Sequence, residues 1–261
     1  MTTPRTPRLW PGGAVLSNGQ YWAIWSRQGT GAAFWQRGGE AVQLIGWQPD
    51  AVEDQRGWLL YLRDEATNVF WSVTPLPSPR PRARYRFRRG AGAAVIECDA
   101  PEVECLVEAW VDPLLPVEFR RLRIRNRSQQ ARVVEVTSYL EVALFPFAAH
   151  AAHPAFSKLF VQTGCFPERG AVWAKRRQRA ASERWPILFH AAVGGGEVQW
   201  ETDRAKFLGR GNTTAAPAAL ARTGPLSGTV GNVLDPVLAL RKRLVLTGGA
   251  SREVTFVLGV A

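Results

Sequence analysis

The chain has 261 residues, of which 46% are hydrophobic and 21% are charged. This balance excludes an intrinsically disordered chain and a membrane-spanning one, and the length suits one large all-β sandwich. The net charge of +11 raises the question of a nucleic-acid partner, because clustered arginines neutralise phosphates.

The compartment follows from three features of the sequence. The longest apolar stretch, residues 139–156, is interrupted by Glu141, two histidines and two prolines, so it cannot span a bilayer. The N-terminus lacks the apolar core and cleavage site of a secretory signal. Three cysteines cannot all pair, and their spacing does not match a metal site. We therefore expect a cytoplasmic protein with reduced cysteines and no membrane partner.

Short segments of alternating apolar and polar residues recur from the N-terminus onward, separated by glycines. This pattern is typical of antiparallel all-β proteins. Residues 58–63 and 69–74 flank the turn sequence DEATN, which predicts a hairpin. The proline-rich segment 75–82 then predicts a crossover between two sheets.

Arginines alternate with apolar residues in 82–88 and 121–127, which places the guanidinium groups on one face of each strand. An acidic strand lies between them in the sequence. A turn at 113–116 would pair Glu108 with Arg121, Glu104 with Arg125, and Glu102 with Arg127. Such pairs contribute roughly 0.2 to 1 kcal/mol each. Because they neutralise the arginines, we expect no nucleic-acid partner and keep a basic nucleic-acid-binding sandwich only as an alternative.

Residues 146–163 bring histidine, serine, lysine and phenylalanine together, and the basic run AKRRQR follows at 174–179. We expect recognition groups for a polar ligand to concentrate here. The sequence AHAAH predicts one helical turn that Pro154 ends, because proline disfavours helical backbone in the residue before it.

The C-terminal part again predicts strands. Segments 185–193 and 196–202 are separated by glycines, which predicts a hairpin. TTAAPAALAR at 213–222 predicts a short helix capped by Thr214. Segments 237–246 and 254–260 predict closing strands, and the apolar end suggests a domain that normally precedes another.

Paired carboxylates are the usual machinery of glycoside hydrolysis. The candidates are Asp50, Asp54, Asp64, Glu201 and Asp203. Nothing in their spacing places two of them face to face. We expect turn residues and ion-pair partners at strand edges, and no catalytic residue.

Other chemistry has weak support. His150 and His153 could share a helical face, with His190 or Cys165 as a third metal ligand, but zinc sites need three or four ligands. We expect no metal and no cofactor, and a loop-fixing hydrogen bond for His153. Ser157 lies near His153 but lacks a nucleophile elbow.

The sequence FLGRG at 207–211 places an arginine between glycines, whose backbone amides can approach an anion closely. As a phosphate motif this is weak, and a bent connection between a strand and a helix explains it equally well.

Tryptophans are dense near the N-terminus, at positions 10, 22, 25, 35, 47, 58 and 71. Aromatic rings stack on the apolar faces of sugars, so this density fits a free-standing carbohydrate-binding module as well as a core. In a large sandwich we expect most of them to be core residues.

Several sequence words resemble the N-terminal β-sandwich domain of glycoside hydrolase family 94, whose members include phosphorylases and synthases of β-glucans. They are LSNGQY (16–21), GWLLYLRD (57–64), FWSVTPLP (70–77), EFRRLRIRNRS (118–128), TSYLEVAL (137–144), AHPAFSKLFVQT (152–163), ETDRAKFLGRGN (201–212) and LSGTVGNVLDPVLALR (226–241). The match extends over nearly the whole chain.

The resemblance implies an all-β fold, a large two-sheet antiparallel super-β-sandwich with short helical insertions that forms a single domain over residues 1–261. In the family the catalytic aspartate belongs to a separate α/α barrel, so the chain alone is expected to be no enzyme. The implied partners are that barrel, a β-glucan oligosaccharide and a second copy in a homodimer.

Residues expected to bind carbohydrate or face the barrel are His150, His153, Phe156, Lys158, Arg176, Arg177, Arg204, Phe207 and Arg210. One departure concerns His150, because the family tends to have an acidic residue three positions before the matching histidine.

Overall fold

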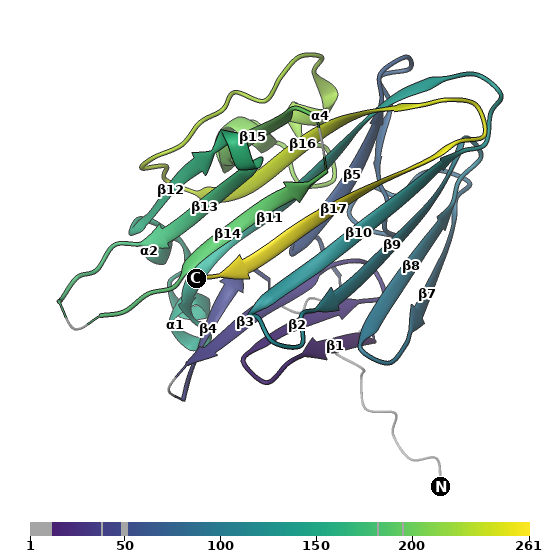
Figure 1. Cartoon of the computed structure of the whole chain (residues 1–261). Coiled ribbons are helices and arrows are strands. Elements are labelled where there is room, and N and C mark those ends of the chain that lie inside the picture. The colour runs from purple at the N-terminus through teal and green to yellow at the C-terminus, as the bar shows by residue number, and fades with distance from the viewer. Residues whose placement is uncertain (1–11, 38, 48–51, 182, 195) are drawn as a thin grey trace, which may run out of the picture.

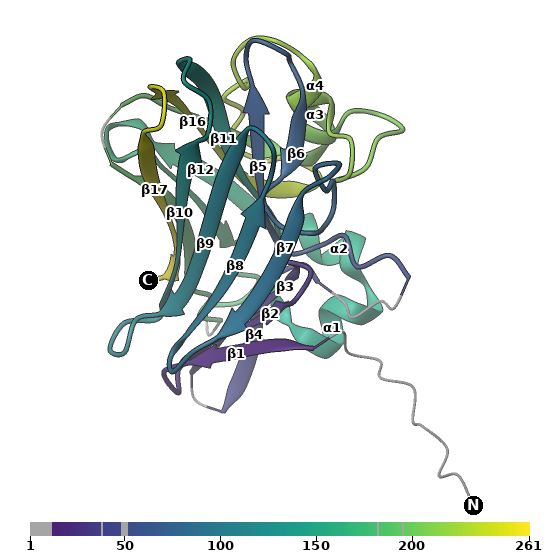
Figure 2. The same ribbon diagram turned by 90° about the vertical axis from the view of Figure 1, so that its right-hand side faces the viewer.

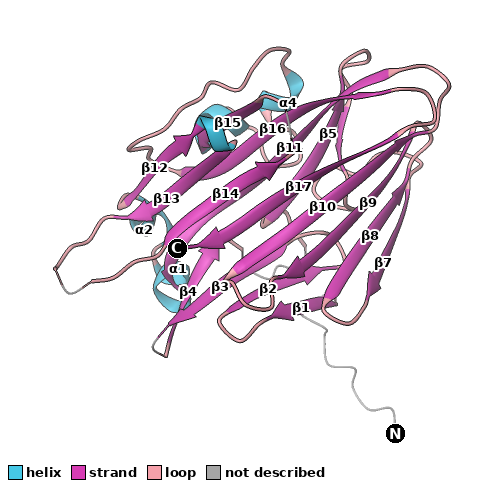
Figure 3. Cartoon of the chain, in the orientation of Figure 1, coloured by secondary structure: helices cyan, strands magenta, loops and turns pink. Residues whose placement is uncertain are grey.

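Two antiparallel β-sheets face each other (Figure 1), and the helices are few and short (Figure 3). The computed structural model describes residues 12–37, 39–47, 52–181, 183–194 and 196–261. The predicted all-β, two-sheet antiparallel sandwich with short helical insertions is confirmed. Asp50 and Trp10 lie outside the described residues.

One sheet has nine strands in the described part of the chain. Its hydrogen-bonded path runs through β1 (Gly13–Ser17), β2 (Tyr21–Ser26), β3 (Gly31–Arg37), β4 (Glu40–Ile45), β11 (Arg132–Pro146), β16 (Pro236–Leu246) and β15 (Val198–Asp203). Beside this path, β5 (Trp58–Asp64) pairs with β11, and β6 (Phe70–Ser72) pairs with β5. The hairpin predicted around DEATN is therefore confirmed.

The other sheet has eight strands among the described residues. Its order is β12 (Val161–Phe166), β13 (Ala171–Arg176), β14 (Ile187–Val193), β17 (Ser251–Val260), β10 (Val117–Asn126), β9 (Val103–Val111), β8 (Ala93–Asp99) and β7 (Arg84–Arg89). Segment 75–82 leads from β6 in the first sheet to β7 in the second, which confirms the predicted crossover.

Two local predictions were wrong. β14 pairs with β13 and β17 in the eight-stranded sheet, whereas β15 pairs with β16 in the nine-stranded sheet, so residues 185–202 form no hairpin. The chain changes sheets there instead. Thr214 caps no helix, because the nearest helix begins only at Ala218 and the Thr214 hydroxyl donates to the Gln55 carbonyl at 3.0 Å.

Four short α-helices occur among the described residues: α1 (Phe147–Ala152), α2 (Pro154–Lys158), α3 (Arg204–Leu208) and α4 (Ala218–Ala221). A single 3₁₀ turn, η1 (Pro167–Arg169), joins β12 to β13. Figure 2 shows the α-helices on the side of the nine-stranded sheet that faces away from the eight-stranded sheet. They cover that outer face.

Hydrophobic residues form two cores. The main core lies between the sheets, where every second residue of β8 and β9 points inward, as side chains alternate along a strand. A second core lies beneath α3 and α4. Its buried residues are Leu59, Tyr61, Tyr139, Phe207, Leu208, Leu220, Val237 and Ala239. Since β5, β11 and β16 contribute to both cores, they are buried on both faces over much of their length.

The tryptophans belong mainly to the interior, as predicted. Trp25, Trp47, Trp58 and Trp71 are buried, and Trp22 and Trp35 are half-buried. Their density therefore reflects the size of the sandwich core more than an exposed sugar platform.

The predicted register of β9 and β10 is confirmed. Glu108 lies opposite Arg121 and Glu104 opposite Arg125. Glu108 forms an ion pair with Arg121, and the Oε2 atom of Glu104 lies 3.9 Å from Nη1 of Arg125. These charges occupy the solvent-facing side of the eight-stranded sheet, where carboxylates of β9 partner arginines of β10.

The third predicted pair differs in its side chains. Arg127 donates its backbone N–H to the Glu102 carbonyl, so the register extends as expected. However, the Arg127 guanidinium pairs with Asp99 at 2.6 Å, and the Glu102 carboxylate pairs with Arg80 at 2.6 Å. Arg80 comes from the crossover segment, whose path the local pattern did not reveal.

The edge strand β7 is also strongly basic. Arg84 and Arg86 are exposed, and Arg88 forms an ion pair with Glu97 on β8. Among the described residues β7 pairs with β8 alone, so it forms the edge of the eight-stranded sheet as far as the structure describes it.

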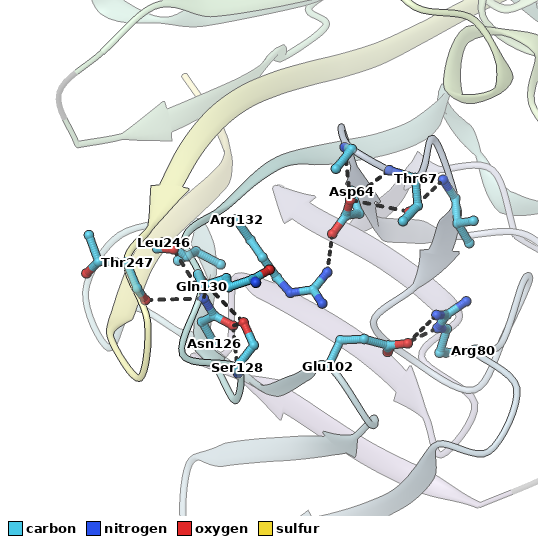
Figure 4. Close-up of polar contacts among 12 residues, drawn as sticks. Asp64, Thr67, Arg80, Glu102, Asn126, Ser128, Gln130, Arg132, Leu246 and Thr247 are labelled. Carbon is cyan, nitrogen blue, oxygen red and sulfur yellow. Dashed lines mark hydrogen bonds and ion pairs between the residues drawn. The ribbon is translucent and has the colours of Figure 1, made fainter.

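Turns at one end of the sandwich hold the strands in place (Figure 4). Asp64 accepts from the N–H groups of Ala66 and Thr67 and from the Arg132 guanidinium, at 2.6 Å for the latter. The Asn126 amide nitrogen donates to three carbonyls, those of Gln130, Leu246 and Thr247. The connection from β10 to β11 is thereby tied to the connection from β16 to β17.

A line of buried polar contacts crosses the main core. Glu118 and Arg120 on β10 form a buried ion pair, with 3.0 Å between Oε1 and Nε. The Tyr21 hydroxyl on β2 donates to Glu118 at 3.2 Å, and Arg120 donates to the Trp58 carbonyl on β5. The guanidinium also lies 4.4 Å and 5.2 Å from the ring centroids of Trp58 and Trp25. One ion pair thus joins strands of both sheets.

His190 on β14 continues this line. Its Nδ1 lies 2.9 Å from the Val257 carbonyl, which can only accept, so Nδ1 carries the proton of the neutral ring. Its Nε2 then accepts from the Ser138 hydroxyl on β11 at 2.8 Å, while Ser138 accepts from the Trp58 indole at 2.7 Å. Burial lowers the pKa of His190 to about 4.

Acid should weaken the sandwich through His190. Since its pKa in the folded state lies below the unfolded value of 6.5, its contribution to stability is complete above that pH and is lost as the pH falls towards 4. Relative to His190→Gln, the wild type should lose about 2.5 kcal/mol between about pH 7.5 and about pH 4.5 in urea unfolding. The exposed His153→Gln is the control, and an equal pH dependence in both variants would refute this role.

Glu118→Gln should lower the free energy of unfolding by about 3 kcal/mol, because the amide leaves the buried Arg120 guanidinium without a counter-charge. Glu108→Gln on the outer face is the matched control and should cost less than about 1 kcal/mol, as exposed ion pairs contribute little. Urea unfolding measures both. Similar losses in the two variants would contradict the bridging role of Glu118.

Candidate functional site

The central strand β11 leads directly into the candidate site. Its first part pairs with β5 and its last part with β4, and the register shifts between Val142 and Phe145. Leu144 lies in this irregularity with a φ of 46°. The strand therefore bends before it enters α1, so that α1 and α2 lie against its end.

The helices follow the local sequence. The alanines of 147–152 favour helix, and α1 ends at Ala152 because His153, which precedes a proline, is not helical (φ −140°). Pro154 then occupies the first turn of α2, where its missing N–H costs nothing. The predicted turn ahead of Pro154 is confirmed, and the proline also begins a second helix.

Four charged residues meet beneath α2 and α3, and we call them the Glu141 cluster: Glu141, Lys158, Arg204 and Asp235. Glu141 Oε1 lies 2.8 Å from Arg204 Nε, and Glu141 Oε2 lies 3.4 Å from Lys158 Nζ. Asp235 lies 2.6 Å from Lys158 and 3.5 Å from Arg204. Each cation is therefore shared by two carboxylates.

Glu141 is the buried centre of this cluster, with 3% of its surface exposed. Burial alone would raise the pKa of Glu141, but Lys158 and Arg204 outweigh burial and hold that pKa below its usual value. The same contacts raise the pKa of Arg204 despite its partial burial. Glu141 and Arg204 are thus both ionised at neutral pH.

His150 and Ser157 connect α1 to α2. His150 Nδ1 lies 3.1 Å from Ser157 Oγ, and the Ser157 hydroxyl donates to the Pro154 carbonyl at 2.9 Å. Burial, followed by the charge of Lys158, lowers the pKa of His150. Ser157 is fully buried and its proton is engaged, so the pair fastens the helices and does not suit nucleophilic attack. The partner of Ser157 is His150 and not His153, which is exposed.

Arg176 fastens α2 to β13. Its guanidinium donates to the Ser157 carbonyl at 2.7 Å and lies 3.8 Å from the ring centroid of Phe145. The rings of Phe160 and Trp185 also lie within 5.3 Å of it. Only 2% of Arg176 is exposed, and among the described residues its Nε and Nη2 atoms have no hydrogen-bond partner. Aromatic faces take the place of a carboxylate here.

The predicted site residues divide into three groups. His150, Lys158, Arg176 and Arg204 meet around α2 in the contacts described above. His153, Phe156 and Arg177 lie on the surface nearby. Phe207 lies in the second core, stacked on Tyr139 at 4.6 Å, and Arg210 lines a separate cavity beside α3.

Sequence reasoning missed the two acids of the cluster. Glu141 stands in the apolar segment YLEVALF, and a lone acid in a strand buried on both faces must find a cation. That signal was present in the sequence. Asp235 gave no comparable signal. It lies in the loop just before β16, far from Glu141 in the sequence.

The candidate carboxylates within the described ranges, Asp54, Asp64, Glu201 and Asp203, all make structural contacts. Asp54 accepts from Thr30 at 2.6 Å and from the Trp47 indole at 2.9 Å. Asp64 caps a turn, and Asp203 accepts from the Ala205 N–H at the start of α3. Glu201 accepts from the backbone N–H groups of Thr202 and Asp203.

Neither a metal-binding group of side chains nor a membrane-spanning helix is found among the described residues. No three histidine, cysteine or acidic side chains among them are grouped so as to hold a metal ion. None of the described helices has the length and apolar character needed to cross a membrane.

The surface of α1 and α2 is apolar. Phe147, Phe156 and Leu159 are 47%, 53% and 46% exposed. We call these three residues the α1–α2 patch. The exposed Arg177 donates to the Leu159 carbonyl at 2.9 Å, so a charged group borders the patch.

The family model for the glycosyl hydrolase 94 supersandwich domain matches residues 1–261. The chain belongs to this family, as its supersandwich domain. The supersandwich domain is 35% identical over 250 residues to the cyclic beta-(1,2)-glucan synthase NdvB of Rhizobium meliloti, covering 93% of this chain. It is 23% identical over 262 residues to the N,N'-diacetylchitobiose phosphorylase of Vibrio furnissii, covering the whole chain.

The supersandwich domain spans 8% of the length of the synthase and 32% of the length of the phosphorylase. Among solved structures, a polysaccharide lyase has a similar fold, with a TM-score of 0.51 and 12% identity over 92% of this chain and 32% of the lyase. That likeness concerns the fold alone.

Glu141→Gln should destabilise the domain by roughly 3 kcal/mol at neutral pH, because two cations lose their buried partner. The pKa of Glu141 lies below its usual value of 4.5, so the advantage of the wild type is present above that pH and is lost in more acidic solution. Urea unfolding across this range tests the prediction. Glu253→Gln removes an exposed pair with Arg123 and should cost far less. Equal costs would contradict it.

Proposed function

We propose that this chain is the non-catalytic supersandwich unit of a β-glucan phosphorylase or cyclic β-1,2-glucan synthase, and that it assembles with an α/α-barrel catalytic domain. The observation that carries this proposal is the α1–α2 patch beside the Glu141 cluster. The proposal treats residues 1–261 as one domain.

The patch has the features of a protein contact. Three large apolar side chains are each about half exposed, one on α1, one on α2 and one directly after α2. The exposed Arg177 guanidinium borders them through its hydrogen bond to the Leu159 carbonyl. An apolar centre with a polar rim is typical of protein interfaces. The contacts of Ser157, His150 and Arg176 hold the helices fixed. Docking a partner would therefore cost little conformational entropy.

The lengths of the relatives support a domain partner. Both contain at least twice as many residues outside the matched region as within it, and their names describe a glucan synthase and a chitobiose phosphorylase. In the family the catalytic aspartate belongs to the barrel. The described candidate carboxylates of this chain are occupied by structural contacts, which supports a catalytic centre elsewhere.

Carbohydrate contact is the finer part of the proposal. Phe156 of the patch offers an aromatic face, and the exposed His153 and Arg177 offer polar groups, to a β-glucan at the edge of the barrel. A free-standing carbohydrate-binding module has less support, because the N-terminal tryptophans are mostly buried. Cys98, Cys105 and Cys165 are free thiols, which supports placement in the reducing cytoplasm.

The assembly can be tested with a barrel from the same parent polypeptide or gene cluster, supplied as a separate chain. The supersandwich alone should release no sugar phosphate from β-1,2-glucan and phosphate, whereas the mixture should be active. Phe156→Glu should weaken binding to the barrel at least tenfold, because a charge enters an apolar contact.

Phe166→Glu is the matched control, since Phe166 is 48% exposed at the far end of β12. Binding in sedimentation velocity should survive this change. Sugar phosphate release by the isolated chain would overturn the proposal, as would equal effects of the two substitutions. Self-association lost only with Phe156→Glu would instead assign the patch to a homodimer.

A further inference from the structure

A second site candidate lies beside α3 and shares no residue with the Glu141 cluster. A cavity of about 430 Å³ is lined by residues of α3, α4 and the segment 222–227. Figure 2 shows α3 and α4 outside the nine-stranded sheet. This volume suits a small ligand. Lys206, Arg210 and Arg222 all line it, and all three are exposed.

These three cations line one cavity together, and they differ from the ion-paired arginines at 121–127. Within the described part of the chain, none of them lies within 4.0 Å of a carboxylate, whereas the arginines at 121, 123, 125 and 127 all do. Lys206 donates to the Thr229 hydroxyl at 2.8 Å. Their positive charge is therefore not neutralised by the protein around them.

Glu201 is the one acid in the cavity lining, and its carboxylate is already engaged. Its Oε1 accepts from the N–H groups of Thr202 and Asp203 at 2.9 and 2.8 Å. Its Oε2 accepts from the hydroxyls of Ser227 and Thr229. Four donors thus satisfy this carboxylate, and it is not left to bind the three cations.

The cavity wall is held from beneath by two more guanidinium groups. Arg241 donates to the carbonyls of Ala219 and Gly224, and Arg63 donates to the carbonyl of Arg222. Both arginines are buried and share one carboxylate. Glu135 lies 2.6 Å from Arg63 and 3.5 Å from Arg241. Two buried cations on a single acid leave excess positive charge below the wall and fix its backbone before any ligand arrives.

The FLGRG sequence contributes differently from the phosphate motif considered above. The Gly209 N–H donates to the Ala205 carbonyl at 2.9 Å and is not free for an anion. Gly209 has a φ of +80°, and an added Cβ would lie 2.7 Å from the Cβ of Ala218. This glycine therefore allows α3 and α4 to approach, and Arg210 lines the cavity directly after it.

We infer that this cavity binds a phosphate monoester. Three unneutralised cations match a dianion better than a single carboxylate, and guanidinium groups bind phosphate oxygens in pairs. Ala218, Ala219 and Leu226 supply an apolar wall for the body of a small sugar. The inference does not depend on docking of a barrel, since it uses none of the residues of the α1–α2 patch.

Isothermal titration at constant ionic strength tests this inference with inorganic phosphate, glucose 6-phosphate and glucose. Both phosphates should bind and glucose should not. Tighter binding of glucose 6-phosphate would support the inference, whereas equal binding would overturn the monoester and leave inorganic phosphate as the ligand. Arg210→Gln and Arg222→Gln should each weaken binding about tenfold.

Arg86→Gln is the matched control, because Arg86 is equally exposed but lies on β7, away from the cavity. It should leave the affinity unchanged, and thermal melts should show all variants folded. No heat from either phosphate would overturn the inference. So would an equal loss of affinity in Arg86→Gln, which would indicate attraction to the net charge alone.

Discussion

The buried ion pair between Glu118 and Arg120 is the constraint on which the sandwich depends. Two charges removed from water are costly unless every remaining hydrogen-bonding group is satisfied. Here the satisfaction comes from Tyr21 and Trp58 on the opposite sheet. The two sheets can therefore approach in only one arrangement that keeps the pair bonded, which gives specificity to an otherwise apolar interface.

β11 transmits this arrangement to the outer surface. Ser138 points into the main core and meets His190, whereas Tyr139 and Glu141 point outward to the second core and the charged cluster. A slip of one residue would exchange the two faces and destroy both sets of contacts. The position of α1 and α2, and with it the proposed contact surface, is thus coupled to polar bonds in the interior.

Much of the fold could be predicted, because alternation along a strand is a local property. The pairing of Glu108 with Arg121 followed from charge pattern and one turn. The pairing of β14 could not be predicted in this way, since a glycine-rich connection suits a hairpin and a change of sheet equally. The same limit applies to the site. Lys158 and Arg204 were identified, but Asp235 approaches them only through tertiary folding.

The basic outer strand β7 has a further consequence for behaviour at high concentration. A strand with one unpaired side can recruit the same strand of another copy, and continued addition would build a fibre. Arg84 and Arg86 would then stand beside identical cations at close range. Repulsion between these arginines opposes edge-to-edge pairing. The arginines of β7 therefore protect the edge strand from aggregation.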